Sequence, residues 1–232
     1  MKDNCLMFII DAPVSENIDP ELKKVFGAER AVHIYIDLLN SIYKTAKEVE
    51  NTSIIISYKS SGKHPDLTWL DEDDPGFLDA KIKNLNERIS SLFNWSFNAG
   101  AKKAVLLSNF SPEVTPEWIS DSFEQLNDET IIIGPTDEKP YLFGITVNNS
   151  ELVEEINFFT GGLTDDIYEK IKKFRLKSVS QPKTYTVKGE ETLRIWIESK
   201  DSSSHIFTQN THPKEHKKRE KKTHSVENDL FQ

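Results

Sequence analysis

Short, densely apolar runs that alternate with longer amphipathic stretches are the strongest constraint on how this chain can fold. Such runs are typical of strands buried on both faces of a sheet, and they occupy residues 5–10, 53–58, 104–107, 130–133 and 141–147. Between the first three runs, apolar side chains recur at helical spacing over residues 28–49 and 78–99. Because strands that alternate with helices form βαβ units, we predict an α/β domain of three layers (α/β/α) with a mostly parallel central sheet.

Weaker signals complete the outline of the fold. Thr115-Pro116-Glu117 predicts the start of a helix, because threonine is a good N-cap and proline fits the first helical turn. The polar stretch 60–76 contains glycine, proline and an acidic run, which predicts a long surface loop. Further along the chain we expect helices at 165–174 and 190–198 and short strands at 177–179 and 184–187.

The last part of the chain differs in composition from the rest. Residues 201–232 carry six basic side chains, five acidic ones and four of the six histidines, with very few apolar ones. A segment of this kind cannot bury enough apolar surface to offset the entropy lost on ordering it. We therefore predict an α/β domain over residues 1–200 and a disordered polar tail over 201–232. His212 and His216 have a spacing that occurs in metal sites, but a flexible polar tail is the simpler interpretation.

Charge and cysteine content exclude several classes of function. The chain has 232 residues with 29 Lys and Arg against 38 Asp and Glu, a net charge of −9, which argues against a nucleic-acid binder. A single cysteine, Cys5, allows no disulfide within the chain and no cysteine-based zinc site. No apolar run approaches the ~20 residues that span a bilayer, and the N-terminus does not resemble a signal peptide. We expect a cytoplasmic protein without membrane contact, and the sequence identifies no protein partner.

Three segments directly follow predicted strands and are therefore candidates for a binding site. In an open α/β sheet, ligands bind beyond the carboxyl ends of the strands, where the strand order reverses. These ends are Asp11-Ala12-Pro13, residues 108–112 and residues 134–138. In the last of them, Asp137 and Glu138 could act as an acid/base pair, although an ordinary solvated turn is the simpler interpretation. The ring of Phe110 could stack on a ligand, or it could fill the core.

Five segments together resemble a known protein family. Residues 100–117, GAKKAVLLSNFSPEVTPE, are similar to the central motif of an uncharacterised bacterial glycosyltransferase-like family that is related to the 2-phospholactate guanylyltransferases. The other four segments follow the family's order at 26–31, 85–89, 134–144 and 185–193, so the resemblance covers roughly residues 5–197. It implies the nucleotide-diphospho-sugar transferase fold, which is the glycosyltransferase-A architecture.

The resemblance also implies which residues would form the substrate cleft. The positions that match the family's motifs, and that we take as cleft candidates, are Asp11, Pro13, Asn109, Phe110, Ser111, Tyr141 and Thr160. Thr160 belongs to Thr160-Gly161-Gly162, a loose match to the family's W-S-T turn, which a plain glycine turn also explains.

The chain departs from the family where a metal would bind. Phe110 stands at the place of the aspartate that is expected to hold the divalent cation bridging the nucleotide phosphates. An aromatic ring cannot ligate a hard cation, which needs oxygen. Lys188 stands at the place of a second candidate acid, so that position carries the opposite charge. The remaining candidates for catalytic groups are Asp137, Glu138 and Lys188, and we expect no metal ligand.

The chain also departs from the family where phosphates would bind. Asp11, Asp19 and Glu21 stand in the pattern in which the family has basic residues. Two like charges ~4 Å apart repel by ~4 kcal/mol at an effective dielectric constant near 20, so an attraction becomes a repulsion. In a second loop, Lys139-Pro140 replaces paired glycines, which removes backbone freedom that a close approach to a ligand needs.

These departures leave two possible functions and favour the first of them. In the first, a glycosyltransferase-like protein has lost metal and nucleotide binding and acts as a non-catalytic binding or regulatory module that needs no cofactor. In the second, the chain is an active nucleotide-sugar or nucleotidyl transferase with a rearranged, metal-independent site, in which Lys188 places a cation near the diphosphate. We expect no cofactor, and Mg²⁺ or Mn²⁺ only if the second hypothesis holds. In either case the expected partner is a nucleotide sugar or another small ligand in a modified cleft.

Overall fold

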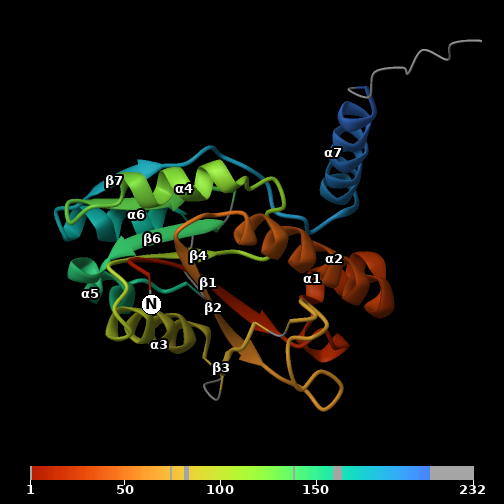
Figure 1. Ribbon diagram of the computed structural model, residues 1–232, viewed down its shortest axis with the longest axis horizontal. Coiled ribbons are helices and arrows are strands. Elements are labelled where there is room, and N and C mark those ends of the chain that lie inside the picture. Colours follow the sequence, from red (N-terminus) through yellow and green to blue (C-terminus); the bar gives the residue numbers. More distant parts are fainter. Residues whose placement is uncertain (1, 74, 81–83, 138, 159–163, 210–232) are drawn as a thin grey trace, which may run out of the picture. The chain divides into compact units, whose positions relative to one another are not determined.

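Seven strands form one mixed sheet in the part of the chain that the computed structural model describes, which is residues 2–73, 75–80, 84–137, 139–158 and 164–209 (Figure 1). The strands are β1 (Asn4–Asp11), β2 (Thr52–Lys59), β3 (Leu78–Asp79), β4 (Lys103–Leu107), β5 (Thr130–Gly134), β6 (Leu142–Thr146) and β7 (Lys177–Ser180). Their order in the sheet is β3-β2-β1-β4-β6-β5-β7. Only β6 runs against its neighbours: it is antiparallel to both β4 and β5, whereas the other pairs are parallel. The predicted α/β fold with a mostly parallel sheet is confirmed.

Helices follow most of the strands. They are α1 (Pro20–Phe26), α2 (Ala28–Lys47), α3 (Leu85–Asn98), α4 (Pro116–Gln125), α5 (Glu151–Glu155), α6 (Thr164–Lys173) and α7 (Glu190–Gln209), with short 3-10 turns at Ser15–Asn17 and Val147–Asn149. No helix among the described residues is long and apolar enough to cross a membrane.

The sheet separates two apolar cores. Along β1, Leu6 and Phe8 pack with the buried residues of α2 and α4, while Cys5 and Met7 pack with those of α3, α5 and α6. This alternation follows from the period of a strand, in which successive side chains point to opposite faces. Figure 1 accordingly shows α4 and α3 on opposite sides of the sheet. Both faces of the central strands are covered, which is why their sequences read as continuous apolar runs.

Two expected elements differ in the structure. The helix predicted over 78–99 begins only at Leu85, because Leu78 and Asp79 form the edge strand β3 and Asn84 caps the helix by accepting a hydrogen bond from the Asn86 amide at 2.9 Å. The strand predicted over 184–187 is not formed. Instead, the segment makes isolated backbone bonds, among them one from the Val187 amide to the Phe110 carbonyl at 2.9 Å.

The loop predicted over 60–76 contains no helix or strand among its described residues, but it does not lie wholly on the surface. Leu67 is fully buried, Leu70 nearly so, and Trp69 packs against the same apolar core. The indole of Trp69 donates a hydrogen bond to the Tyr58 hydroxyl at 3.2 Å. Although most of the loop is polar, its few apolar side chains therefore hold it against the sheet.

The chain divides into two units, Met1–Trp196 and Ile197–Gln232. Helix α7 continues to Gln209, so residues 201–209 are helical where we expected the disordered tail to begin. Residues 210–232 lie outside the described residues, and the domain boundary at residue 200 stays a prediction.

Candidate functional site

A cleft of about 430 Å³ lies at the edge of the sheet where the parallel strands β1 and β4 end. The chain passes from β1 to β2 on one side and β4 pairs with β1 on the other, so the strand order reverses between β1 and β4. Ile9 of β1, Leu106 and Leu107 of β4 and the loop Ser108–Phe110 line the cleft. The first residues of the antiparallel strand β6 reach the same edge from the opposite direction. The structure thus places a cleft where the rule for open α/β sheets predicts a ligand site.

Most of the cleft wall is apolar. The apolar residues that line it are Ile9, Leu22, Leu85, Ile89, Leu106, Leu107, Phe110, Pro140, Tyr141, Phe143, Phe158 and Val187. The polar ones are Asp19, Glu21, Ser108, Asn109, Lys139, Thr186 and Lys188. A mainly apolar wall with a few polar groups is typical of small-molecule sites.

Asn109 is held in the wall by one hydrogen bond and leaves a second polar atom without a partner. Its side-chain nitrogen donates to the Ile9 carbonyl oxygen at 2.7 Å. Because a carbonyl can only accept, this bond fixes which end of the amide is nitrogen, and the oxygen Oδ1 remains as an acceptor. Oδ1 is buried and has no donor among the described residues. Such an atom typically costs about 1–3 kcal/mol, so a donor at this point would be stabilising.

Phe110 both lines the cleft and packs against the core. Its ring centroid lies 5.9 Å from that of Tyr35 on α2, at a distance typical of aromatic pairs. Its carbonyl accepts from the Val187 amide, and its own amide donates to the Ser108 hydroxyl at 3.3 Å. The loop after β4 is thus held from two sides with an aromatic side chain at the cleft.

Tyr141 is a structural part of the cleft wall. It is fully buried, and its hydroxyl donates to the Pro182 carbonyl at 3.1 Å. Burial raises the pKa of this phenol, so the group stays neutral. The ring lies against the backbone of Gly134, where a Cβ would overlap it. Ser111, by contrast, is buried, does not line the cleft and has no partner for its hydroxyl among the described residues.

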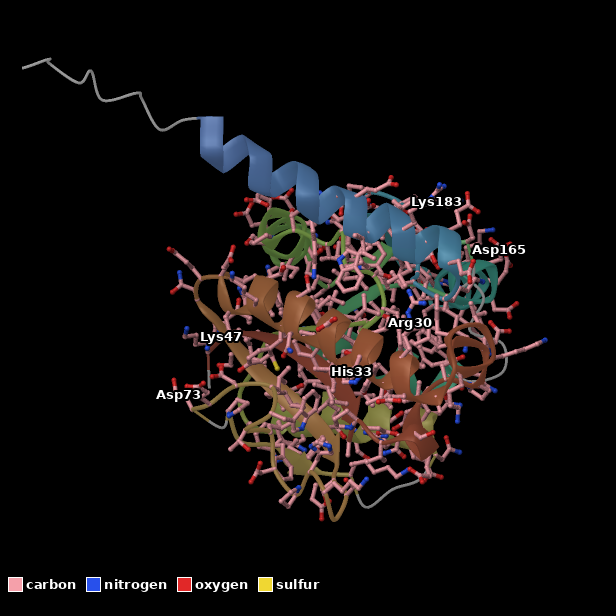
Figure 2. The ribbon with its side chains drawn as sticks, turned by 90° about the vertical axis from the view of Figure 1, so that its right-hand side faces the viewer. Arg30, His33, Lys47, Asp73, Asp165 and Lys183 are labelled. Atoms are coloured by element: carbon pink, nitrogen blue, oxygen red, sulfur yellow. The ribbon has the colours of Figure 1, made fainter. Side chains whose placement is uncertain are left out.

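Asp11 and Pro13 do not line this cleft. The Asp11 carboxylate forms an ion pair with Arg88 of α3 at 2.6 Å, so its charge is compensated inside the protein. Pro13 borders a separate, more open groove together with His33 and His64. Figure 2 shows His33 on the side of α2 that faces the viewer. The repulsion of phosphates that the sequence led us to expect from Asp11 is therefore weakened by its partner.

Of the candidate catalytic groups that the structure describes, Lys188 lines the cleft and Asp137 does not. Asp137 forms an exposed ion pair with Lys183 at 2.7 Å and does not line the cleft. The hydrogen bond from Lys183, and then the charges of Lys183 and Lys188, lower the pKa of Asp137, so it is ionised and poorly suited as a general acid at neutral pH. Lys188 does line the cleft. Glu138 and Thr160 lie outside the described residues.

Two acids at the start of helix α1 line the cleft: Asp19, which precedes the helix, and Glu21 in its first turn. Asp19 is the N-cap: its carboxylate accepts from the amides of Glu21 at 2.7 Å and Leu22 at 3.3 Å, and Pro20 follows in the first turn. Our sequence analysis missed this helix, although Asp-Pro-Glu is a good start signal. Glu21 is exposed, and its carboxylate has no hydrogen bond or ion pair with any described residue.

No group of three or more His, Cys, Asp and Glu side chains in the described part of the chain is placed to hold a metal ion. Asp19 and Glu21 are the carboxylates that line the cleft among the described residues, and Asp19 is already engaged as a cap. The expectation that the protein needs no metal or other cofactor stays a prediction.

Comparison with known proteins gives structural matches. No protein-family model matches the chain, and no curated protein matches it in sequence. A proposed nucleotide-diphospho-sugar transferase from Desulfovibrio desulfuricans G20 superposes with a TM-score of 0.72 at 20% identity, over 82% of this chain and 84% of the other. A nucleotidyl transferase from Methanothermobacter thermautotroptrophicus follows with 0.56 at 10% identity, over 90% and 100%. A 4-diphosphocytidyl-2C-methyl-D-erythritol synthase from Anaerococcus prevotii gives 0.53 at 11%, over 90% and 97%. The chain therefore has the fold of the nucleotide-diphospho-sugar and nucleotidyl transferases.

Proposed function

We propose that this protein is a non-catalytic binding module built on the transferase fold, with a cleft that takes a small ligand but no metal-bound nucleotide sugar. The observation that carries the proposal is Phe110, which occupies the cleft wall beside Asn109 and packs on Tyr35. The resemblance to the glycosyltransferase-like family related to the 2-phospholactate guanylyltransferases supports this, because that family would have a cation-binding aspartate at the position of Phe110.

The chemistry of the cleft wall supports the same proposal. A nucleotide diphosphate brings two or more negative charges, which need cations or a metal to replace their hydration. Among the described carboxylates, only Glu21 lines the cleft without a hydrogen bond to a described group. Mg²⁺ in nucleotide sites is usually held by one or two carboxylates together with substrate phosphates and waters, so the described part of this cleft offers it no more than a minimal anchor.

Calorimetry with the full chain tests the proposal. A panel of nucleotide sugars is titrated into the protein in the presence and absence of Mn²⁺, and we expect no saturable heat in either condition. A matched variant, Phe110→Asp, shows whether the aromatic ring alone blocks the metal. Binding of a nucleotide sugar by the unmodified chain that requires Mn²⁺ would refute the proposal.

A second candidate function is an active, metal-independent transferase, and one observation favours it. Lys139 and Lys188 both line the cleft, so two cations stand at the site where a diphosphate would lie. A lysine can stabilise charge on a leaving phosphate as a point charge. In this case a nucleotide sugar binds at micromolar concentration without metal, and Lys188→Ala abolishes the binding. The exposed Lys63→Ala, outside the cleft, is the matched control.

A further inference from the structure

We propose that the cleft binds a small amphiphilic amine, which is a molecule with an aromatic or aliphatic body and a cationic head that donates hydrogen bonds. This inference rests on the proposed function, because it names a ligand class for the cleft that we regard as non-catalytic. Three features of the described residues carry it: the apolar wall, an unpaired carboxylate at the rim, and a buried acceptor without a donor.

The apolar wall selects for the body of the ligand. Ile89 and Leu85 of α3, Leu106 of β4, Phe143 of β6 and Phe158 all border a volume of about 430 Å³. A volume of this size holds a small organic molecule, and apolar contacts are its main source of affinity. Phosphate groups would lose hydration against these side chains without replacement, whereas an aromatic or aliphatic group would not.

Glu21 selects for the charge of the head. Its carboxylate is exposed at the rim and has neither a hydrogen bond nor an ion pair with any described residue. Asp19 is the other described carboxylate that lines the cleft, and one of its oxygens accepts the hydrogen bonds that cap α1. A ligand ammonium at the rim would therefore meet a carboxylate that forms no ion pair with a described residue.

Asn109 selects for a hydrogen-bond donor on the ligand. The residue is only 9% exposed, and its Oδ1 has no partner among the described residues, while its nitrogen is engaged with Ile9. Oδ1 is covered in the structure, so to accept from a ligand N–H the side chain has to turn, and this turn exchanges the bond from its nitrogen to the Ile9 carbonyl oxygen for the new one. An acceptor in the wall and an anion at the rim both call for N–H groups, and neither suits a phosphate or a carboxylate.

Lys139 and Lys188 also line the cleft, and each has an interaction within the protein; the charge of Lys188 helps to lower the pKa of Asp137. Their presence makes an anionic ligand the alternative that the experiment has to exclude.

Nuclear magnetic resonance titration of the full, isotope-labelled chain distinguishes these cases with matched probes. 2-Phenylethylamine carries the ring and an ammonium, 3-phenylpropanoate the ring and a carboxylate, and trimethyl(2-phenylethyl)ammonium the ring and a charge but no N–H. We expect saturable shifts of the Leu107 and Phe143 amides with the amine. The trimethylated probe should bind about fivefold more weakly, since it cannot donate, and the carboxylate more weakly still. Equal or tighter binding of 3-phenylpropanoate, or no saturable shift with the amine, overturns the inference.

A charge variant tests the role of the rim. Glu21→Gln keeps the size of an exposed side chain and removes its charge. We therefore expect it to weaken the binding of 2-phenylethylamine by about two- to fivefold. Glu16→Gln is the control, because Glu16 is also exposed, lies on the same connection and does not line the cleft. Unchanged binding in Glu21→Gln overturns the inference. Nucleotide sugars in a parallel titration report separately on the proposed function: their binding refutes it, whereas failure of the amine alone leaves it standing.

Discussion

Arg88 Nη1 lies 2.6 Å from Asp11 Oδ1 and thereby joins helix α3 to the end of strand β1, at the edge of the sheet that holds the cleft. The same guanidinium donates through Nη2 to the carbonyls of Ser57 at 3.3 Å and Ile10 at 3.4 Å. From the other face, the Tyr35 hydroxyl donates to the Asp11 carbonyl at 3.0 Å. One buried arginine therefore fastens the ends of β1 and β2 to the helix beneath them.

Removal of this arginine should destabilise the fold strongly. In Arg88→Met, the half-buried carboxylate of Asp11 loses its partner and two carbonyls lose a donor, so we expect a loss of about 3 kcal/mol in the free energy of unfolding measured by urea denaturation. Lys102→Met is the control, because it breaks an ion pair with Asp3 that is exposed on both sides. If the two variants lose equal stability, the Arg88 network is not a main support of this edge.

Gly134 is needed because the Tyr141 ring covers it. A Cβ at this position would overlap the ring, which is itself held by the Pro182 carbonyl. We expect Gly134→Ala to lower the free energy of unfolding by about 1–3 kcal/mol, as overpacking does, and to shift the midpoint of thermal unfolding accordingly. Gly62→Ala has open space around its Cβ and should leave the midpoint unchanged. An unchanged midpoint in Gly134→Ala would show that the Tyr141 ring moves aside at little cost.

Hydrophobic periodicity predicted most of the elements, but it could not predict how they pair. The apolar run 141–147 looks like the other four runs, yet β6 is inserted between β4 and β5 and runs against both. A strand buried on two faces has the same composition in either direction, so its direction depends on contacts that are remote in sequence. The boundary at Leu78 was wrong for a similar reason, because two residues at the start of an apolar stretch pair with β2 instead of joining α3.

The position of the site could be predicted better than its charges. The rule for open sheets placed Asn109 and Phe110 at the edge where the cleft is found. The charge of Asp11, however, depends on an arginine 77 residues away in the chain, and no local pattern indicates that pair. The sequence could have predicted the role of Asp19, because a helix N-cap has a local sequence signature.

Alkaline pH should destabilise the protein through Cys5. Burial raises the pKa of this thiol from its ordinary value of 9.0 to about 12, so the folded chain keeps the proton where the unfolded chain loses it. The stabilising effect is complete below pH 9 and is lost as the pH rises from about 9 toward 12, by up to about 1.4 kcal/mol per pH unit. Urea denaturation of the protein and of Cys5→Ala, each at pH 8.0 and pH 9.5, measures this. We expect the free energy of unfolding to fall less between the two pH values in Cys5→Ala than in the unmodified protein. Equal falls in the two proteins would contradict a buried neutral thiol.

The Asp19 carboxylate should act on stability through the helix N-cap rather than through its charge. Asp19→Ala removes the acceptor for two amides of α1, and we expect the free energy of unfolding to fall by about 1 kcal/mol. Asp19→Asn keeps an acceptor oxygen and removes the charge, so it should retain most of the stability. Urea denaturation of the two variants side by side separates the explanations. If Asp19→Asn were as unstable as Asp19→Ala, the charge itself would be the important property. If both were as stable as the original chain, α1 would not depend on its cap, and the acid would be left to interact with a ligand in the cleft.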